Sequence, residues 1–287
     1  MRGAPIILAF IAFFILVSVA LLMLSVKIAL AVFAGGLVVV TIFFRPFWGL
    51  LIYLMLLYIR PQEFVGALRA QPIMLAMAVT VLGTLLVHNA LMKKPFIVFD
   101  MRQGLYMTVF FALIPLSQLQ RLYLTGARDS FDAFLPVFLM FFMIVNLVRT
   151  FPQLKKTFLL LLYMTIFLAL NGILQYWRGF DIAGQTMYEG RIRWIGIFED
   201  PNDLGLTLLA FTPFAVLSVI RERQTIIKRG IWVLVTLVLI YALYLTNSRG
   251  TFLGLLAVLG WLLARRWGPV RGLAVASVLA AVLFVAG

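Results

Sequence analysis

Long runs of apolar residues, separated by short polar segments, follow one another along most of the chain. A helix needs roughly 20 apolar residues to cross a bilayer, and fewer where the bilayer thins. The runs are continuous and do not alternate with a period of two, which favours membrane helices over barrel strands. They predict an all-α polytopic membrane protein with about eleven transmembrane helices, at residues 5–26, 28–44, 47–59, 72–91, 104–119, 131–148, 157–177, 204–220, 230–246, 251–264 and 272–287.

Composition agrees with a membrane protein, because 64% of the residues are hydrophobic and only 12% are charged. The first run is too long for a signal peptide and no polar cleavage region follows it, so we expect a retained span. The chain has no cysteine, which excludes disulfides, thiolate metal sites and a cysteine nucleophile.

The net charge of +14 is distributed unevenly between alternate loops. With a cytoplasmic N-terminus, fifteen basic residues fall inside and nine outside, while eight of the ten acids fall outside. This asymmetry predicts that orientation, since positive charge accumulates in cytoplasmic loops. No basic run is long enough for a nucleic-acid stripe, so we expect no nucleic-acid partner. No Asp, Glu, Lys or Arg lies deep in a predicted span, which counts against an ion-coupled transporter.

Two polar motifs fall in the outer loops, and we expect them to meet on one face of the membrane. The first, residues 190–204 (GRIRWIGIFEDPNDL), carries Arg191 and Arg193 on the side where orientation does not require positive charge. Both arginines bind one ligand only if this segment is irregular, which its glycines permit. The second motif, residues 246–250 (TNSRG), places Arg249 in a minimal turn that needs no arginine. An arginine there presents a planar fork suited to two phosphate oxygens, although interfacial snorkelling also explains arginines at such borders.

An acidic cluster, Glu199, Asp200 and Asp203, precedes the apolar run that starts at residue 204. Asp or Asn in this place is a helix N-cap signal. A helix N-terminus facing an outer cavity also favours anions, but the nearby acids oppose a diphosphate. Three roles stay open for these acids: holding the arginines in place, contacting an acceptor sugar, or binding a cation.

Two polar residues within apolar runs are interpreted as structural. His88, the single histidine, falls near the predicted inner end of the run at 72–91, far from the outer motifs. It is therefore a poor candidate for the general base of an outer-face reaction. Asn171 is expected to make an interhelical hydrogen bond.

The two motifs together resemble the C-terminal core of bacterial O-antigen ligases, O-antigen polymerases and protein O-oligosaccharyltransferases. The family pattern is an arginine before G-x-F-x-x-P-N, followed two spans later by S-R-G. Residues 58–63 (YIRPQE) resemble the N-terminal half of some members more weakly. The matching positions here are Arg193, Gly196, Phe198, Pro201, Asn202, Ser248, Arg249 and Gly250.

The resemblance implies a fold, a reaction and a site. The fold is a glycosyltransferase-C-like helical bundle in the bacterial inner membrane, with an N-terminal transmembrane region at residues 1–189 and a core at 190–287. The reaction moves a glycan from undecaprenyl diphosphate to a periplasmic acceptor: lipid A core, a growing polysaccharide or a protein hydroxyl. No metal or other cofactor is implied. The substrate-binding residues are Arg191, Arg193, Asn202, Ser248 and Arg249.

One family feature has no counterpart here. Members carry a large, late periplasmic loop whose histidine is proposed as the base, and that loop would begin just after Gly287. We therefore expect a fragment that is inactive by itself; the alternative is a substitute base among Glu199, Asp200 and Asp203. Two other functions stay open, a flippase for lipid-linked oligosaccharides and a non-catalytic scaffold for envelope assembly. A flippase predicts a continuous polar path and broken helices at mid-depth, and the sequence shows little of either.

Overall fold

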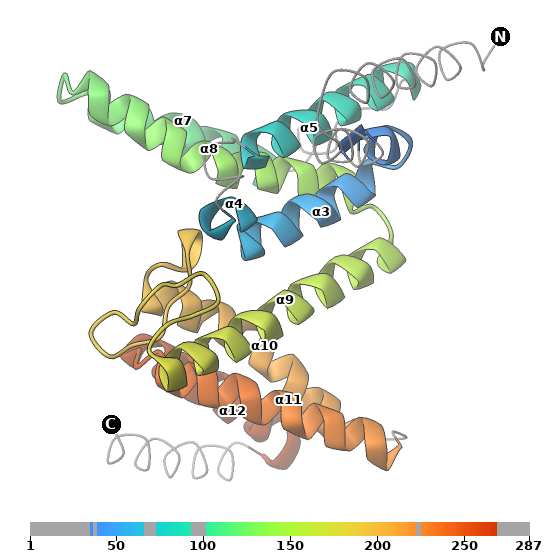
Figure 1. Ribbon diagram of the computed structural model, residues 1–287. Coiled ribbons are helices and arrows are strands. Elements are labelled where there is room, and N and C mark those ends of the chain that lie inside the picture. Colours follow the sequence, from blue (N-terminus) through green and yellow to red (C-terminus); the bar gives the residue numbers. More distant parts are fainter. Residues whose placement is uncertain (1–34, 37–38, 66–72, 93–101, 222–224, 269–287) are drawn as a thin grey trace, which may run out of the picture. The chain divides into compact units, whose positions relative to one another are not determined.

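The computed structural model describes residues 35–36, 39–65, 73–92, 102–221 and 225–268. These residues are helical apart from their loops and contain no β-strand, so the all-helical prediction is confirmed for this part of the chain. The elements are α3 (Pro46–Ile59), α4 (Pro61–Phe64), α5 (Ile73–Met92), α7 (Arg102–Leu119), α8 (Leu124–Leu147), α9 (Phe151–Arg178), the 3₁₀ turn η2 (Gly196–Phe198), α10 (Pro201–Ile220), α11 (Ile226–Leu245) and α12 (Arg249–Trp267) (Figure 1).

Five of the described helices are long and apolar enough to cross a membrane: α5, α8, α9, α10 and α11. The predicted runs at 104–119 and 251–264 are also helical, as α7 and α12, but are not among these five. The runs at 5–26 and 272–287, and most of 28–44, lie outside the described residues. The membrane class is therefore supported, and a total of eleven spans stays a prediction.

Helix α8 begins at Leu124, before the start of its predicted apolar run at residue 131. The additional segment includes the charged Arg128, which lies one helical turn before Asp132 at the start of the predicted run, with Nε and Oδ2 separated by 3.7 Å. Opposite charges at this spacing support a solvated helix end. Helix α8 therefore extends beyond its apolar run, which marks only the buried length of the helix.

The contacts between residues divide the chain into two compact units. The first contains the described residues up to Leu54 and from Ile73 to Thr157, including the α7–α8 hairpin. In that hairpin Phe111 stacks on Phe138 with ring centroids 4.5 Å apart. The second unit contains residues 55–65 and the described residues from Phe158 onward. Its boundaries differ from the predicted division at residue 190, because residues 55–65 and 158–189 pack with the predicted core.

The second unit has a continuous apolar core built by α9, α10, α11, α12 and the loop before α10. Trp194 from this loop is only 1% exposed, and Leu204 and Leu208 of α10 are fully buried beside it. Helix α10 packs along α11 and also contacts α12 (Figure 1). This unit holds both polar motifs of the sequence, so the candidate site is built within it.

Candidate functional site

The segment between α9 and α10 is an ordered loop that folds back on itself. Tyr188 and Arg191 exchange backbone hydrogen bonds of 3.0 and 2.9 Å. Between them, Glu189 and Gly190 both have positive φ, 51° and 75°. Two successive positive φ values form the tight turn that matches the twist of paired strands, and glycine adopts such a φ without strain. This turn places Arg191 and Arg193 on the returning arm of the loop.

Burial alternates along the returning arm. Ile192 and Trp194 are 0% and 1% exposed, whereas Arg191 and Arg193 beside them are partly exposed. Alternation of this kind is typical of extended backbone, in which residues two apart lie on the same side. The expectation that the two arginines need an irregular segment to share one side is therefore corrected.

Two buried amide side chains of α9 hold this loop. Gln175 donates from Nε2 to the Gln185 carbonyl (3.0 Å) and accepts at Oε1 from the Arg193 backbone N–H (2.8 Å). Asn171 accepts at Oδ1 from the Ile182 N–H at 3.2 Å. The prediction of an interhelical bond for Asn171 is thus wrong, because its amide satisfies loop backbone. Buried amides with these partners fix the loop on the helix.

Asp181 is a buried carboxyl in the same loop that the sequence patterns did not single out. Its Oδ1 accepts from the N–H groups of Ala183 and Gln185, both at 2.8 Å, while Oδ2 is buried without a hydrogen-bond partner in the described part of the chain. Burial raises the pKa of this carboxyl above its ordinary value. An aspartate before a glycine turn is a loop-closing signal that sequence reading could have used.

Arg191 connects the two polar motifs. Its Nε donates to the Thr246 carbonyl at 2.8 Å, and its Nη2 donates to Oδ1 of Asn202, also at 2.8 Å. The backbone reinforces this junction, since the Ile192 N–H donates to the Leu245 carbonyl at 3.2 Å. Residues 190–204 and 246–250 therefore meet, as the sequence led us to expect.

Arg193 has a separate set of contacts. Its Nε donates to the Thr186 carbonyl at 3.1 Å, and its guanidinium carbon lies 5.5 Å from the centroid of the Tyr188 ring. Neither contact carries negative charge. In the described part of the chain the ion pairs are Arg60–Glu63 and Arg128–Asp132. The interpretation that the acidic cluster holds the arginines in place is therefore wrong.

The acidic cluster has a structural role at α10. Asp200 is the N-cap and accepts from the Asn202 N–H at 2.7 Å, which confirms the predicted cap. Glu199 and Asp203 are exposed and lie beside this first turn. Within the described ranges no three His, Cys, Asp or Glu side chains form a group able to hold a metal ion.

Residues 248–250 begin helix α12. Ser248 is 3% exposed and is the N-cap, with its Oγ accepting from Thr251 N (3.4 Å) and Thr251 Oγ1 (2.9 Å). Its predicted substrate-binding hydroxyl is thus engaged in capping. Arg249 is exposed at the first position of the helix, and its guanidinium has no partner among the described residues. The partial positive charge at a helix N-terminus disfavours a cation there, so helix stability does not explain Arg249.

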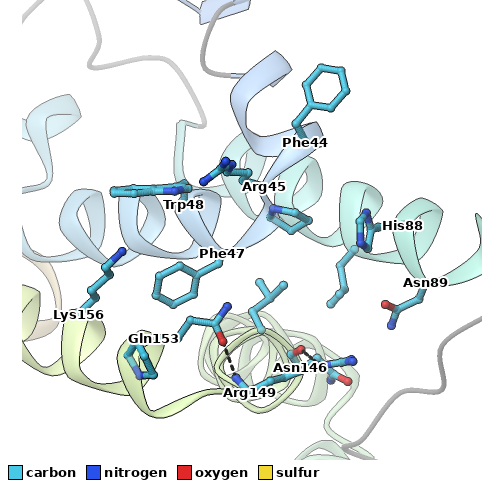
Figure 2. Close-up of a pocket in the computed structure, with 14 residues that line it drawn as sticks. Phe44, Arg45, Phe47, Trp48, His88, Asn89, Asn146, Arg149, Gln153 and Lys156 are labelled. Atoms are coloured by element: carbon cyan, nitrogen blue, oxygen red, sulfur yellow. Dashed lines mark hydrogen bonds between the residues drawn. The ribbon is translucent and has the colours of Figure 1, made fainter. Parts of the chain in front are cut away.

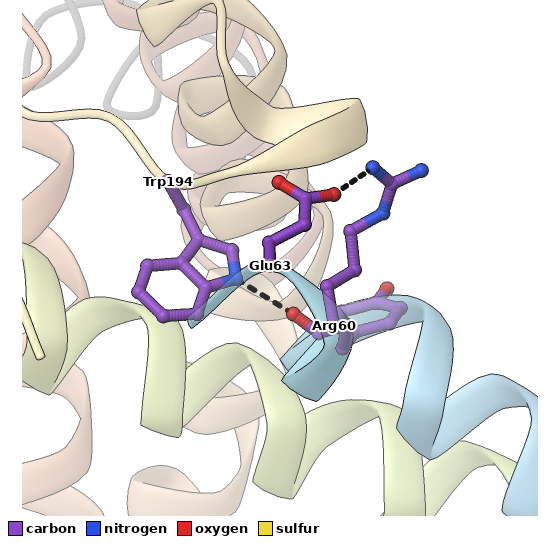
Figure 3. Close-up of polar contacts among 4 residues, drawn as sticks. Arg60, Glu63 and Trp194 are labelled. Atoms are coloured by element: carbon purple, nitrogen blue, oxygen red, sulfur yellow. Dashed lines mark hydrogen bonds and ion pairs between the residues drawn. The ribbon is translucent and has the colours of Figure 1, made fainter. Parts of the chain in front are cut away.

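Residues 58–63 contribute to the same unit from far away in the sequence. The Trp194 indole N–H donates to the Tyr58 carbonyl at 2.7 Å, and Arg60 pairs with Glu63 (Figure 3). A Cβ added to Gly196 would collide with the Arg60 side chain, so that side chain lies directly on the glycine. The sequence marked this segment only through a weak resemblance.

His88 belongs to the first unit and has no place in the site of the second.

No protein-family profile, curated protein or solved structure matches this chain. The chemistry of the residues themselves therefore carries the functional argument, together with the resemblance of the two motifs.

Proposed function

We propose that the protein transfers or polymerises a glycan from an undecaprenyl-diphosphate donor to an acceptor hydroxyl at the outer face of a bacterial inner membrane. The observation that supports this best is a set of arginines, Arg191, Arg193 and Arg249, with no carboxylate partner in the described residues. A membrane protein gains no stability from keeping such charges unpaired. A polyanionic ligand would neutralise them.

The arginines differ in how they would serve a diphosphate. Arg191 is tied to Thr246 and Asn202, so it mainly holds the two motifs together. Arg193 uses Nε for the loop, and its terminal nitrogens have no protein partner in the described chain. The guanidinium of Arg249 has no hydrogen-bond partner in the described residues. We therefore assign the donor diphosphate to Arg193 and Arg249, with Arg191 and Asn202 in support and Ser248 as the cap that places Arg249.

The proposed reaction breaks the bond between the anomeric carbon and the diphosphate, while the acceptor oxygen attacks that carbon. Negative charge develops on the leaving diphosphate, and fixed guanidinium groups stabilise it without reorganising. The hydrogen bonds between Gln175 and the loop keep Arg193 in position. Glu199 and Asp203 stay candidates for accepting the hydroxyl proton, whereas the carboxylate of Asp200 is occupied as a cap.

The test is glycan transfer by the full-length protein in its own cells. Arg249→Ala and Arg193→Ala should each lower transfer by about 10²- to 10³-fold, as expected when one charge-stabilising donor is removed. Arg128→Ala is the matched control, because Arg128 is an exposed arginine of the first unit and should leave transfer unchanged.

Arg191→Ala is a weaker test, because losing its bonds would also disturb the loop. Unimpaired transfer in both the Arg193 and Arg249 variants, at normal protein levels, would overturn the assignment. If those variants instead block movement of radiolabelled donor across liposomes while the wild type transfers no glycan, the protein is a transporter.

A further inference from the structure

The first unit contains a cavity, lined by both polar and apolar side chains, that the proposed glycan chemistry does not use. It has a volume of about 360 Å³ and lies where the N-terminal ends of α3 and α9 meet the C-terminal ends of α5 and α8 (Figure 2). All its lining residues belong to the first unit, and none belongs to the arginine motifs. It is therefore a separate site.

Three cationic side chains line this cavity: Arg45, Arg149 and Lys156. No carboxylate is among the lining residues, and none of the three makes an ion pair in the described chain. Arg149 is oriented by a bond of 2.7 Å from its Nε to the Asn146 carbonyl, which leaves its terminal nitrogens available. Uncompensated positive charge around a concave surface attracts anions.

A buried amide provides a second, independent indication of a ligand. Asn89 lines the cavity and is only 4% exposed, yet its Nδ2 has no hydrogen-bond partner among the residues that the structure describes. A buried donor without an acceptor is costly, and side chains in this situation usually have an acceptor nearby. An oxygen of a bound anion would satisfy this amide.

The rest of the lining fits the apolar part of a lipid. Trp48 and Phe47 lie beside the cations, and the Lys156 Nζ lies 5.4 Å from the centroid of the Trp48 ring. Tryptophan beside basic residues at helix ends is typical of the membrane interface. Basic pockets between apolar helices bind phosphate-bearing headgroups. Three helices at this cavity, α5, α8 and α9, are candidate spans.

We propose that this cavity binds the phosphate of an acidic phospholipid headgroup, with Arg45, Arg149 and Lys156 contacting its oxygens and Asn89 donating from Nδ2. A lipid is favoured over a soluble phosphate because aromatic side chains and candidate spans border the cations. The charge distribution predicts that the cavity faces the cytoplasm. The lipid would hold together four helix ends of the first unit.

The experiment measures lipid retention by the full-length protein, purified in detergent and mixed with phosphatidylglycerol, cardiolipin or phosphatidylcholine. Native mass spectrometry counts the bound lipids, and thermal unfolding reports their stabilising effect. The wild type should retain the two acidic lipids in preference to phosphatidylcholine. The double variant Arg45→Gln/Lys156→Gln should retain them about tenfold less, because charge-assisted bonds to phosphate are lost.

Lys155→Gln is the matched control, since Lys155 is an exposed lysine next to Lys156 that does not line the cavity. It should retain acidic lipids like the wild type. Asn89→Leu tests the buried amide: without acidic lipid the variant should be as stable as the wild type or more so, and its stabilisation by acidic lipid should be reduced.

Three outcomes would overturn the proposal. If the Lys155 variant loses as much acidic lipid as the double variant, lipid binding depends on overall positive charge and not on the residues that line the cavity. Equal retention of phosphatidylcholine and acidic lipids would show that the cavity does not select a headgroup with net negative charge, as the proposal requires. Stabilisation by inorganic phosphate alone, to the same extent as by acidic lipid, would identify a soluble anion as the ligand.

Discussion

Individual arginines of this protein carry the same charge in very different surroundings. Arg60 has a carboxylate partner, Arg191 has neutral oxygen partners, and Arg249 has none within the described ranges. In a membrane protein the unpaired cations are the informative ones, because stability alone does not require them. The arginines of the site are thus distinguished by partners more than by position in the sequence.

Gly196 is the residue where backbone and side-chain constraints coincide. Its φ is +71°, and the Arg60 side chain occupies the space that a Cβ would need. Gly184 has a similar φ of +81° but open space around it. In Gly184→Ala only the left-handed backbone is penalised, by about 1–2 kcal/mol. Gly196→Ala should lose more, because Arg60 must also move.

The measurement for this pair is thermal unfolding of the purified protein, followed by tryptophan fluorescence. The Gly196 variant should melt at a lower temperature than the Gly184 variant. Equal melting temperatures would show that contact with Arg60 is unimportant.

At the scale of elements, small residues allow the helices of the second unit to pack closely. Gly205 of α10 faces two buried threonines, and a Cβ there would lie 2.6 Å from Thr251 Oγ1 and 3.1 Å from Thr246 Oγ1. Small residues at such contacts let helix backbones approach within membranes. The same contact keeps the N-terminal part of α10 against the Ser248 cap of α12.

Gly205→Ala should therefore destabilise the second unit by about 1–3 kcal/mol, the usual cost of overpacking. Gly230→Ala in α11 is the control, because a Cβ there meets nothing within 4 Å. That variant should be neutral, or more stable by up to about 1 kcal/mol through helix propensity. Equal thermal stability of the two variants would contradict the close approach of α10 and α12.

At the scale of the whole molecule, the unequal distribution of charge predicts a single orientation. The chain has no cysteine, so an introduced cysteine is a unique label site. Glu189→Cys, at the exposed turn before Arg191, should react with a membrane-impermeant maleimide in intact cells. Ile226→Cys, 91% exposed at the start of α11, should react only after permeabilisation. The reverse labelling pattern would exclude a cytoplasmic N-terminus with the site outside.

Several structural features of this protein were predictable from short stretches of its sequence. Continuous apolar runs predict helices, because backbone groups in lipid must be satisfied within the segment. Asp200 was identifiable as a cap because its partner, Asn202, is two residues away. The meeting of the two polar motifs was also expected, from their shared side of the membrane.

Only the tertiary structure decided which partners hold the site together. Trp194 bonds to Tyr58 across 136 residues and Arg191 to Thr246 across 55, and Arg60 lies on Gly196. The buried Asp181 and the amide of Gln175 are likewise defined by the folded loop. Periodicity and capping describe neighbours along the chain, whereas these contacts arise when packed helices bring distant polar groups out of water and each must find a partner.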